Sequence, residues 1–223
     1  MSRFILVAMM MAVTVAGCNR FPDNGLQIRA NLPPDDSCLF SADQDIRLLR
    51  GSYDISYRNA LSGEPSDYII APLVESYLIS NALEFQAEQN NLQVDNFDIT
   101  ILLPDGSPLE GVVNPYRVDT TAILEITEGN SVTQEVAAAI GIPSSYQSAL
   151  VGIPSVILSI RAGGTTSGGF SQRSAPFRWP VDICEDCLSL PVCTLELFLE
   201  QCLPGQDGSP GCLSIADPLP ATP

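Results

Sequence analysis

An apolar run near the start of the chain ends at a cysteine, and it limits the environment in which the rest of the chain can fold. Arg3 is the only charged residue ahead of residues 4–15, which are almost wholly apolar. Such a run is too short to cross a bilayer as a permanent helix, and it is typical of a cleaved export signal. We therefore expect the rest of the chain to fold in an oxidising compartment, where disulfides persist.

Residues 15–18, Val-Ala-Gly-Cys, resemble a bacterial lipobox. The thiol of Cys18 would accept a diacylglyceryl group, and the small residues before it would let a protease reach the bond. Acyl chains such as palmitate then hold a protein on a membrane, at about 0.8 kcal/mol per buried methylene. Asn19, in place of an aspartate, resembles the outer-membrane sorting signal of many Gram-negative lipoproteins. We expect a lipid anchor on Cys18 at the outer membrane or cell surface; an ordinary cleaved signal with a chance cysteine is the alternative.

Charge and two missing residue types narrow the chemistry. The chain carries ten arginines, no lysine and no histidine against 26 acidic residues, a formal net charge of −16. This balance repels nucleic acid, so we predict no nucleic-acid partner. Without histidine or lysine there is no Ser-His-Asp triad, imidazole metal site or Schiff base. Carboxylate chemistry, metal binding by oxygen or thiolate, and plain binding remain, and we predict no cofactor and no metal.

Six cysteines remain beside Cys18, an even number that predicts three disulfides in an exported chain. They are Cys38, Cys184, Cys187, Cys193, Cys202 and Cys212. Five of them crowd into the C-terminal part, so Cys38 must pair with one of these five. We predict Cys184 or Cys187 as its partner, because Cys38 opens the β-rich region and these two close it, and the first and last strands of a domain often end close together.

The middle of the chain has the pattern of short strands. Apolar and polar residues alternate in residues 52–58 and 97–103, the period of a half-buried strand. Residues 68–79, 116–126, 156–161 and 177–183 complete the set, and Phe177, Trp179 and Val181 are expected to anchor the core. Pro72 must lie at an edge or a bulge because it cannot donate to a ladder. In residues 131–141, an alanine run follows capping-box spacing and stops at Gly141, which predicts a short helix.

These elements predict a mainly β fold: an antiparallel, Ig-like β-sandwich with one short helix and a small disulfide-rich module at its C-terminal end. We expect a signal peptide (1–17), a lipidated tether (18–37), the sandwich (38–183), the cysteine-rich module (184–212) and a disordered tail (213–223). Leu26, Ile28 and Leu32 leave open that the second half of the tether forms an edge strand.

The motifs that suggest chemistry favour structural interpretations. The pair Cys184 and Cys187 is a CxxC, but its two acidic central residues would raise a thiol pKa, and the spacing of the later cysteines does not match a zinc ribbon. Asp105-Gly106 and Asp207-Gly208 are turn dipeptides more often than calcium ligands. The glycine-rich residues 163–169 predict a long mobile hairpin loop. A binding loop would use Gly163, Thr165, Thr166, Ser167 and Gly169.

Two segments carry a resemblance to a family. Residues 177–184 (Phe-Arg-Trp-Pro-Val-Asp-Ile-Cys) lead into Cys187, and residues 203–208 read Leu-Pro-Gly-Gln-Asp-Gly. With the lipobox, they resemble uncharacterised surface lipoproteins of myxobacterial type, a resemblance that spans about residues 38–212 and implies no activity. We predict a non-enzymatic lipoprotein with a structural or binding role toward an envelope protein or surface glycan. The alternative is a hydrolase that acts on envelope glycans through a pair of carboxylates.

Overall fold

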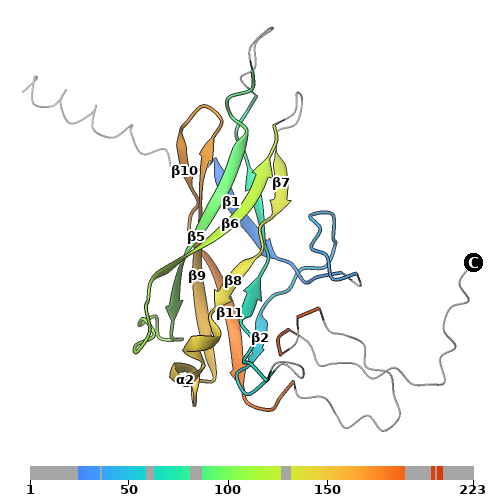
Figure 1. Ribbon diagram of the computed structural model, residues 1–223. Coiled ribbons are helices and arrows are strands. Elements are labelled where there is room, and N and C mark those ends of the chain that lie inside the picture. Colours follow the sequence, from blue (N-terminus) through green and yellow to red (C-terminus); the bar gives the residue numbers. More distant parts are fainter. Residues whose placement is uncertain are drawn as a thin grey trace, which may run out of the picture.

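The computed structural model describes residues 25–35, 37–58, 63–80, 87–126, 132–188, 202–203 and 205–207. This part of the chain is mainly β, with one short helix, α2 (Gln147–Leu150), preceded by a single 3-10 turn at Ser144–Tyr146 (Figure 1). The strands are β1 (Leu26–Asn31), β2 (Gly51–Asp54), β3 (Tyr68–Ile70), β4 (Pro72–Ser76), β5 (Leu92–Leu102), β6 (Tyr116–Leu124), β7 (Thr133–Val136), β8 (Ala139–Ile142), β9 (Ser155–Thr166), β10 (Ser171–Arg173) and β11 (Phe177–Cys184).

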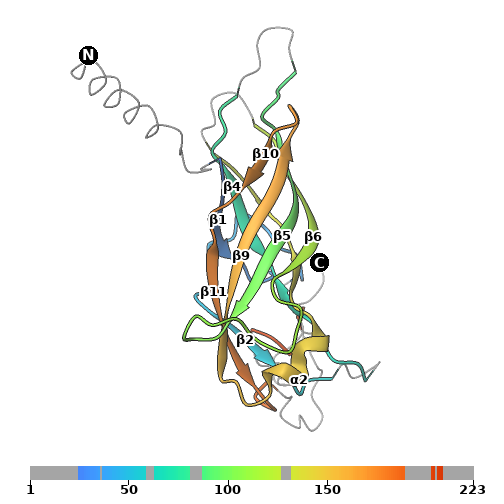
Figure 2. The same ribbon diagram turned by 90° about the vertical axis from the view of Figure 1, so that its left-hand side faces the viewer.

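One layer is a six-stranded sheet with the order β2-β11-β9-β5-β6, to which β10 adds by pairing with β9. The long strands β5 and β9 form its centre and cross the front of the molecule in Figure 2. Alternate residues of β9, among them Val156, Leu158 and Ile160, are fully buried, and the residues between them face outward. The burial of alternate residues in β5 and β11 confirms the strands predicted from the sequence alternation, and it places Phe97 and Trp179 in the core.

The second layer consists of a three-stranded sheet, β1-β4-β7, and a two-stranded sheet, β3-β8. Leu26 of β1, Val74 of β4 and Ile70 of β3 join the residues of the large sheet in a single buried hydrophobic cluster. The two layers therefore bury one common core, which makes the fold a β-sandwich.

One strand pair departs from the predicted antiparallel arrangement. β2 runs parallel to β11, with Val181 opposite Gly51 and Ile183 opposite Tyr53. Parallel neighbours need a long connection rather than a hairpin, and more than a hundred residues separate these two strands in the sequence. The alternation of apolar and polar residues within a strand does not show whether it runs parallel or antiparallel to its neighbour.

The predicted helix at residues 131–141 is wrong. The described part of that range forms β7 and the start of β8 instead. β7 pairs with β4, and Ala139 and Ile140 of β8 pair with β3. Alanine favours a helix by only a few tenths of a kcal/mol per residue over most residue types, so the hydrogen bonds and burial offered by two partner strands outweigh it.

The sandwich begins inside the segment predicted as a tether. β1 lies at the edge of its sheet and pairs with β4 from Leu26 to Asn31, which confirms the edge strand that the apolar residues left open. Pro72 lies at the first position of β4, where the missing N–H costs least, rather than at an edge or bulge. No helix in the described part of the chain has the length and apolar character that a membrane span requires.

Candidate functional site

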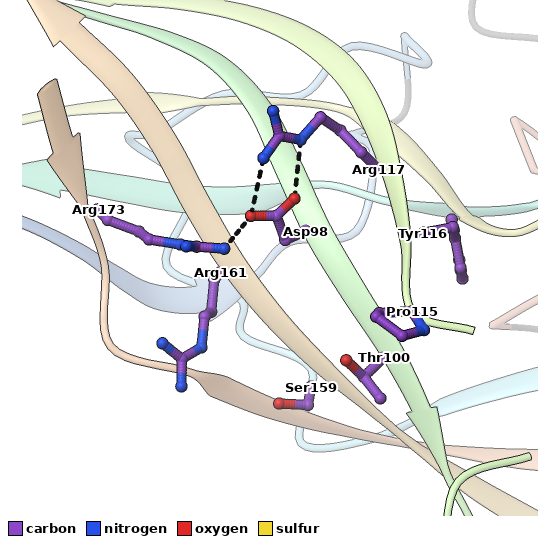
Figure 3. A pocket seen from close by; sticks show the side chains of 8 residues that line it. All are labelled: Asp98, Thr100, Pro115, Tyr116, Arg117, Ser159, Arg161 and Arg173. Atoms are coloured by element: carbon purple, nitrogen blue, oxygen red, sulfur yellow. Dashed lines mark hydrogen bonds and ion pairs between the residues drawn. The ribbon is translucent and has the colours of Figure 1, made fainter.

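A hollow of about 410 Å³ lies on the outer face of the six-stranded sheet, and we call it the arginine hollow (Figure 3). Strands β5, β6, β9 and β10 contribute most of its side chains. Its lining consists of Asp98, Thr100, Pro115, Tyr116, Arg117, Ser159, Arg161 and Arg173. Three arginines thus surround a single carboxylate in a protein whose formal net charge is −16.

Strand register brings these charged residues together. Asp98 lies opposite Arg117 on β6 and opposite Arg161 on β9. Because side chains alternate along a strand, all three point away from the core. Arg173 comes from β10, which a tight turn folds back onto β9. The cations are therefore supplied by three different strands: the two neighbours of β5, which are β6 and β9, and β10, which pairs with β9.

Asp98 holds two of the arginines in place. Arg117 donates from Nε to Asp98 Oδ1 at 2.8 Å and from Nη2 to Oδ2 at 3.2 Å, while Arg173 Nη2 donates to Oδ2. The hydrogen bond from Arg117 is the largest effect on this carboxyl; burial opposes it and Arg173 assists it, so the pKa of Asp98 lies below its usual value. The side chains of Arg117 and Arg173 stay 61% and 53% exposed, so both can still reach a ligand.

The arginine hollow also offers hydrogen-bonding groups that have no partner among the described residues. Within the described residues, Arg161 makes no ion pair or side-chain hydrogen bond, and neither hydroxyl of Thr100 and Ser159 is hydrogen-bonded. Thr100 and Ser159 lie opposite each other on β5 and β9. In Figure 3, Ser159 and Thr100 continue along the sheet beyond Arg161.

A second hollow of about 300 Å³ continues from the first and shares Asp98, Arg117 and Arg173 with it. Its further lining residues are Asp95, Asn96, Gly163, Gly164, Thr165, Ser171 and Gln172. This hollow balances its two arginines with two aspartates, so it adds polar groups without adding net charge. Together the two hollows form an open polar surface with a cationic end.

Residues 163–169, predicted as a long hairpin loop, are mostly strand, so the hairpin is present but its loop is short. β9 continues through Thr166, and the turn to β10 is closed by hydrogen bonds between Thr166 and both Gly169 and Phe170. Glycine is needed at 164, since a Cβ there would lie 2.3 Å from the carbonyl oxygen of Gln93. A bulge in β5 at Val94–Asn96 lies beside it.

The five candidate binding residues of that segment do not lie together in one site. Gly163 and Thr165 line the second hollow, whereas Thr166 is buried and Gly169 occupies the turn with a φ of 85°. Ser167 donates to the carbonyl of Glu88, away from both hollows. The segment therefore reaches the candidate site through the outer face of a strand rather than through a loop.

The predicted partner of Cys38 is also wrong. Cys38 is bonded to Cys202, with Cα atoms 5.0 Å apart, and Cys184 is bonded to Cys187, with Cα atoms 5.9 Å apart. The last strand does end beside β2, but Cys184 at its end is bonded to Cys187 in the turn that follows, so neither is free to bond Cys38. Cys193 and Cys212 lie outside the described residues, as do Cys18, the predicted signal peptide and the predicted disordered tail at residues 213–223.

Asp54 supports the turn between Cys184 and Cys187. This buried carboxylate accepts hydrogen bonds from the backbone and hydroxyl of Ser56 and from the backbone N–H groups of Asp186 and Leu188. Burial alone would raise the pKa of Asp54, but these hydrogen bonds outweigh it and lower the pKa.

A carboxylate oxygen of Asp54 and the Sγ atoms of Cys184 and Cys187 lie within 4.8 Å of one another. They form the one group of potential metal ligands among the described residues. The sulfurs bond each other and four donors occupy the carboxylate, so this donor set does not fit a metal ion.

Residues 205–207, which we call the C-terminal clasp, were missed by sequence reasoning as a structural element. Asp54 N–H donates to the carbonyl of Gly205, and Asp207 N–H donates to that of Ser52, so the clasp pairs with the free edge of β2. The side-chain amide of Gln206 bonds both the N–H and the C=O of Ile69. The Pro-Gly-Gln-Asp-Gly motif at residues 204–208, which contains the clasp, is the sequence feature that could have indicated it.

Asp207 is a half-buried carboxylate beside the edge strand β2. It accepts hydrogen bonds from the backbone N–H of Ser52 and the hydroxyl of Tyr68. Burial raises the pKa of Asp207, and burial together with this carboxylate raises the pKa of Tyr68. Neither residue lines the arginine hollow, where Asp98 instead has a lowered pKa. The hollow therefore lacks the raised-pKa carboxyl that a glycosidase uses as general acid.

No protein-family model matches this chain, and no curated protein matches it.

Proposed function

We propose that this protein is a lipid-anchored envelope protein that binds a ligand on the outer face of its six-stranded sheet. The arginine hollow carries the proposal: it gathers three cations and two hydroxyls without a partner among the described residues, all on a rigid sheet surface. Sites built on strands keep their side chains in place, which lowers the entropy lost on binding. The lipobox at Cys18 supports the anchor and the myxobacterial-type resemblance agrees with it.

The anchor is tested by Cys18→Ser. The wild-type chain should partition into detergent and carry the mass of a diacylglyceryl group and acyl chain on Cys18. The variant should show neither modification. An unmodified wild-type N-terminus at Cys18 would contradict the anchor.

The binding face is tested by substituting a large side chain for a small one inside the arginine hollow. We expect the detergent-solubilised lipoprotein to be retained on an immobilised, lipid-free polysaccharide fraction of the cell envelope. Ser159→Trp should abolish retention because the indole would occupy the space beside Thr100. Thr121→Trp, on the exposed side of β6 but outside the hollow, is the matched control and should be retained. Equal retention of both variants would place binding elsewhere, and no retention of the wild type would leave only a structural role.

A further inference from the structure

We propose that the ligand of the arginine hollow is an acidic oligosaccharide whose carboxylate is bound by Arg161. This inference rests on the proposed function and names the ligand class for the same site. The hollow and its neighbour differ in charge: the first has three arginines and one aspartate, and the second has two of each sign. A ligand that carries both carboxylates and neutral hydroxyls matches this division.

The arginine geometry favours a carboxylate at the cationic end. A guanidinium presents two parallel N–H groups that match the two oxygens of a carboxylate. Asp98 already takes up one such face of Arg117 and a donor of Arg173, and it fixes both side chains in position. Arg161 lies opposite the same aspartate but makes no ion pair within the described residues. It is therefore the cation best placed to receive a carboxylate from outside.

The neutral groups around the arginines favour a sugar. The hydroxyls of Thr100 and Ser159 have no hydrogen-bond partner among the described residues, and they lie on the strands that carry Asp98 and Arg161, within the same hollow. Thr165, Ser171 and Gln172 extend the hydrogen-bonding surface into the second hollow. A sugar acid would place its carboxylate near Arg161 and its hydroxyls against these groups. A densely charged polyanion fits less well, because the whole chain is strongly acidic.

The test measures binding of trigalacturonate to the full lipoprotein in detergent by calorimetry at low salt. Arg161→Gln should weaken binding about five- to tenfold, the loss expected for a charge-assisted hydrogen bond at an exposed site. Arg161→Lys should recover only part of that loss, because an ammonium lacks the fork of donors. Arg50→Gln removes the same charge from an exposed ion pair with Asp182, outside both hollows, and should bind like the wild type.

Two further ligands separate a sugar acid from a simple anion. The trimethyl ester of trigalacturonate keeps the hydroxyls but loses the charge, and acetate keeps the charge but lacks the sugar; both should bind far more weakly than trigalacturonate. Equal binding of the ester, equal competition by acetate or an unchanged affinity of Arg161→Gln would overturn the inference. If trigalacturonate fails while the envelope polysaccharide still retains the wild type but not Ser159→Trp, the ligand class is wrong and the proposed function stands.

Discussion

The indole Nε1 of Trp179 donates a hydrogen bond to the hydroxyl of Tyr68 at 3.0 Å, which joins the two layers of the sandwich. Both side chains are buried, with 2% and 0% of their surface exposed. The Tyr68 hydroxyl in turn donates to Asp207 at 3.1 Å. One phenol therefore connects β11, β3 and the C-terminal clasp, so the core of the sandwich is tied to a segment that follows it in the sequence.

Tyr68→Phe should lower the free energy of unfolding by about 1–3 kcal/mol. The substitution leaves the Trp179 N–H without its acceptor and removes one donor from Asp207. Urea denaturation at neutral pH measures the change. Tyr146→Phe is the control, because its hydroxyl donates to the carbonyl of Val113 at an exposed site and should cost well under half as much. Equal losses would show that the buried network adds nothing.

Cys38→Ser should lower the melting temperature and release a thiol at Cys202. The bridge joins residues 164 positions apart. In the chain-entropy model, closing so long a loop restricts the unfolded chain by about 5 kcal/mol. Peptide mapping of the oxidised protein checks the pairing and should recover Cys38 linked to Cys202 and Cys184 linked to Cys187. A Cys38–Cys184 peptide would contradict the structure.

Asp54→Asn should destabilise the protein by about 1–3 kcal/mol at pH 7, because the amide places a donor against backbone N–H groups. The pKa of Asp54 is lower in the folded chain than in the unfolded chain. Its stabilising contribution is therefore present above about pH 4 and is lost as the pH falls through the folded-state pKa. Unfolding curves between neutral and acidic pH should converge for the variant and the wild type. A constant difference at all pH values would contradict the role of ionised Asp54.

Asp207→Asn should act in the opposite direction. Burial raises the pKa of Asp207 in the folded protein. Its contribution to stability therefore falls as the pH rises from about 4 through the folded-state pKa. Asparagine keeps an acceptor for Ser52 and Tyr68 and tolerates the φ of 55° at this position. The variant should be at least as stable as the wild type at pH 7 and lose that advantage in acid. A marked loss at pH 7 would mean that the charge itself stabilises the clasp.

The carboxyl of Asp98 should titrate below the usual value for aspartate in an NMR pH titration. Its hydrogen bond with Arg117 is the main cause of the lowered pKa, with a smaller contribution from Arg173. Arg117→Gln should therefore raise the pKa of Asp98 more than Arg173→Gln does. Either variant should cost less than about 1 kcal/mol of stability, because both ion pairs are exposed. The reverse order of pKa changes would assign the orienting role to Arg173.

The apolar–polar alternation of the sequence was sufficient to predict the buried residues of strands that bury one face. The alternation around Phe97 and Trp179 placed both in the core, because each side chain's burial depends on the two-residue period of its own strand. The turn at Asp105-Gly106 follows from the same local chemistry, with Asp105 accepting from the N–H and hydroxyl of Ser107.

The sequence pattern of a segment gave the wrong secondary structure where neighbouring strands determine its conformation. Residues 133–142 are rich in alanine, yet they form strands because β3 and β4 offer unpaired backbone groups beside them. Gly163 and Gly164 have the composition of a loop, yet they belong to β9 because a bulge in β5 brings another backbone close. Propensity is worth tenths of a kcal/mol per residue, and tertiary pairing exceeds it.

The acidic balance, the β class and the even set of cysteines follow from composition and short-range spacing alone, and the same kind of spacing predicts an export signal with a lipobox. The bond between Cys38 and Cys202, the contact of Asp207 with Tyr68 and the ring of Arg117, Arg161 and Arg173 around Asp98 become visible only in the folded protein. These contacts join residues far apart in the chain, and they depend on strand order and register. Those properties are set by the packing of the whole core, which no local stretch of sequence encodes.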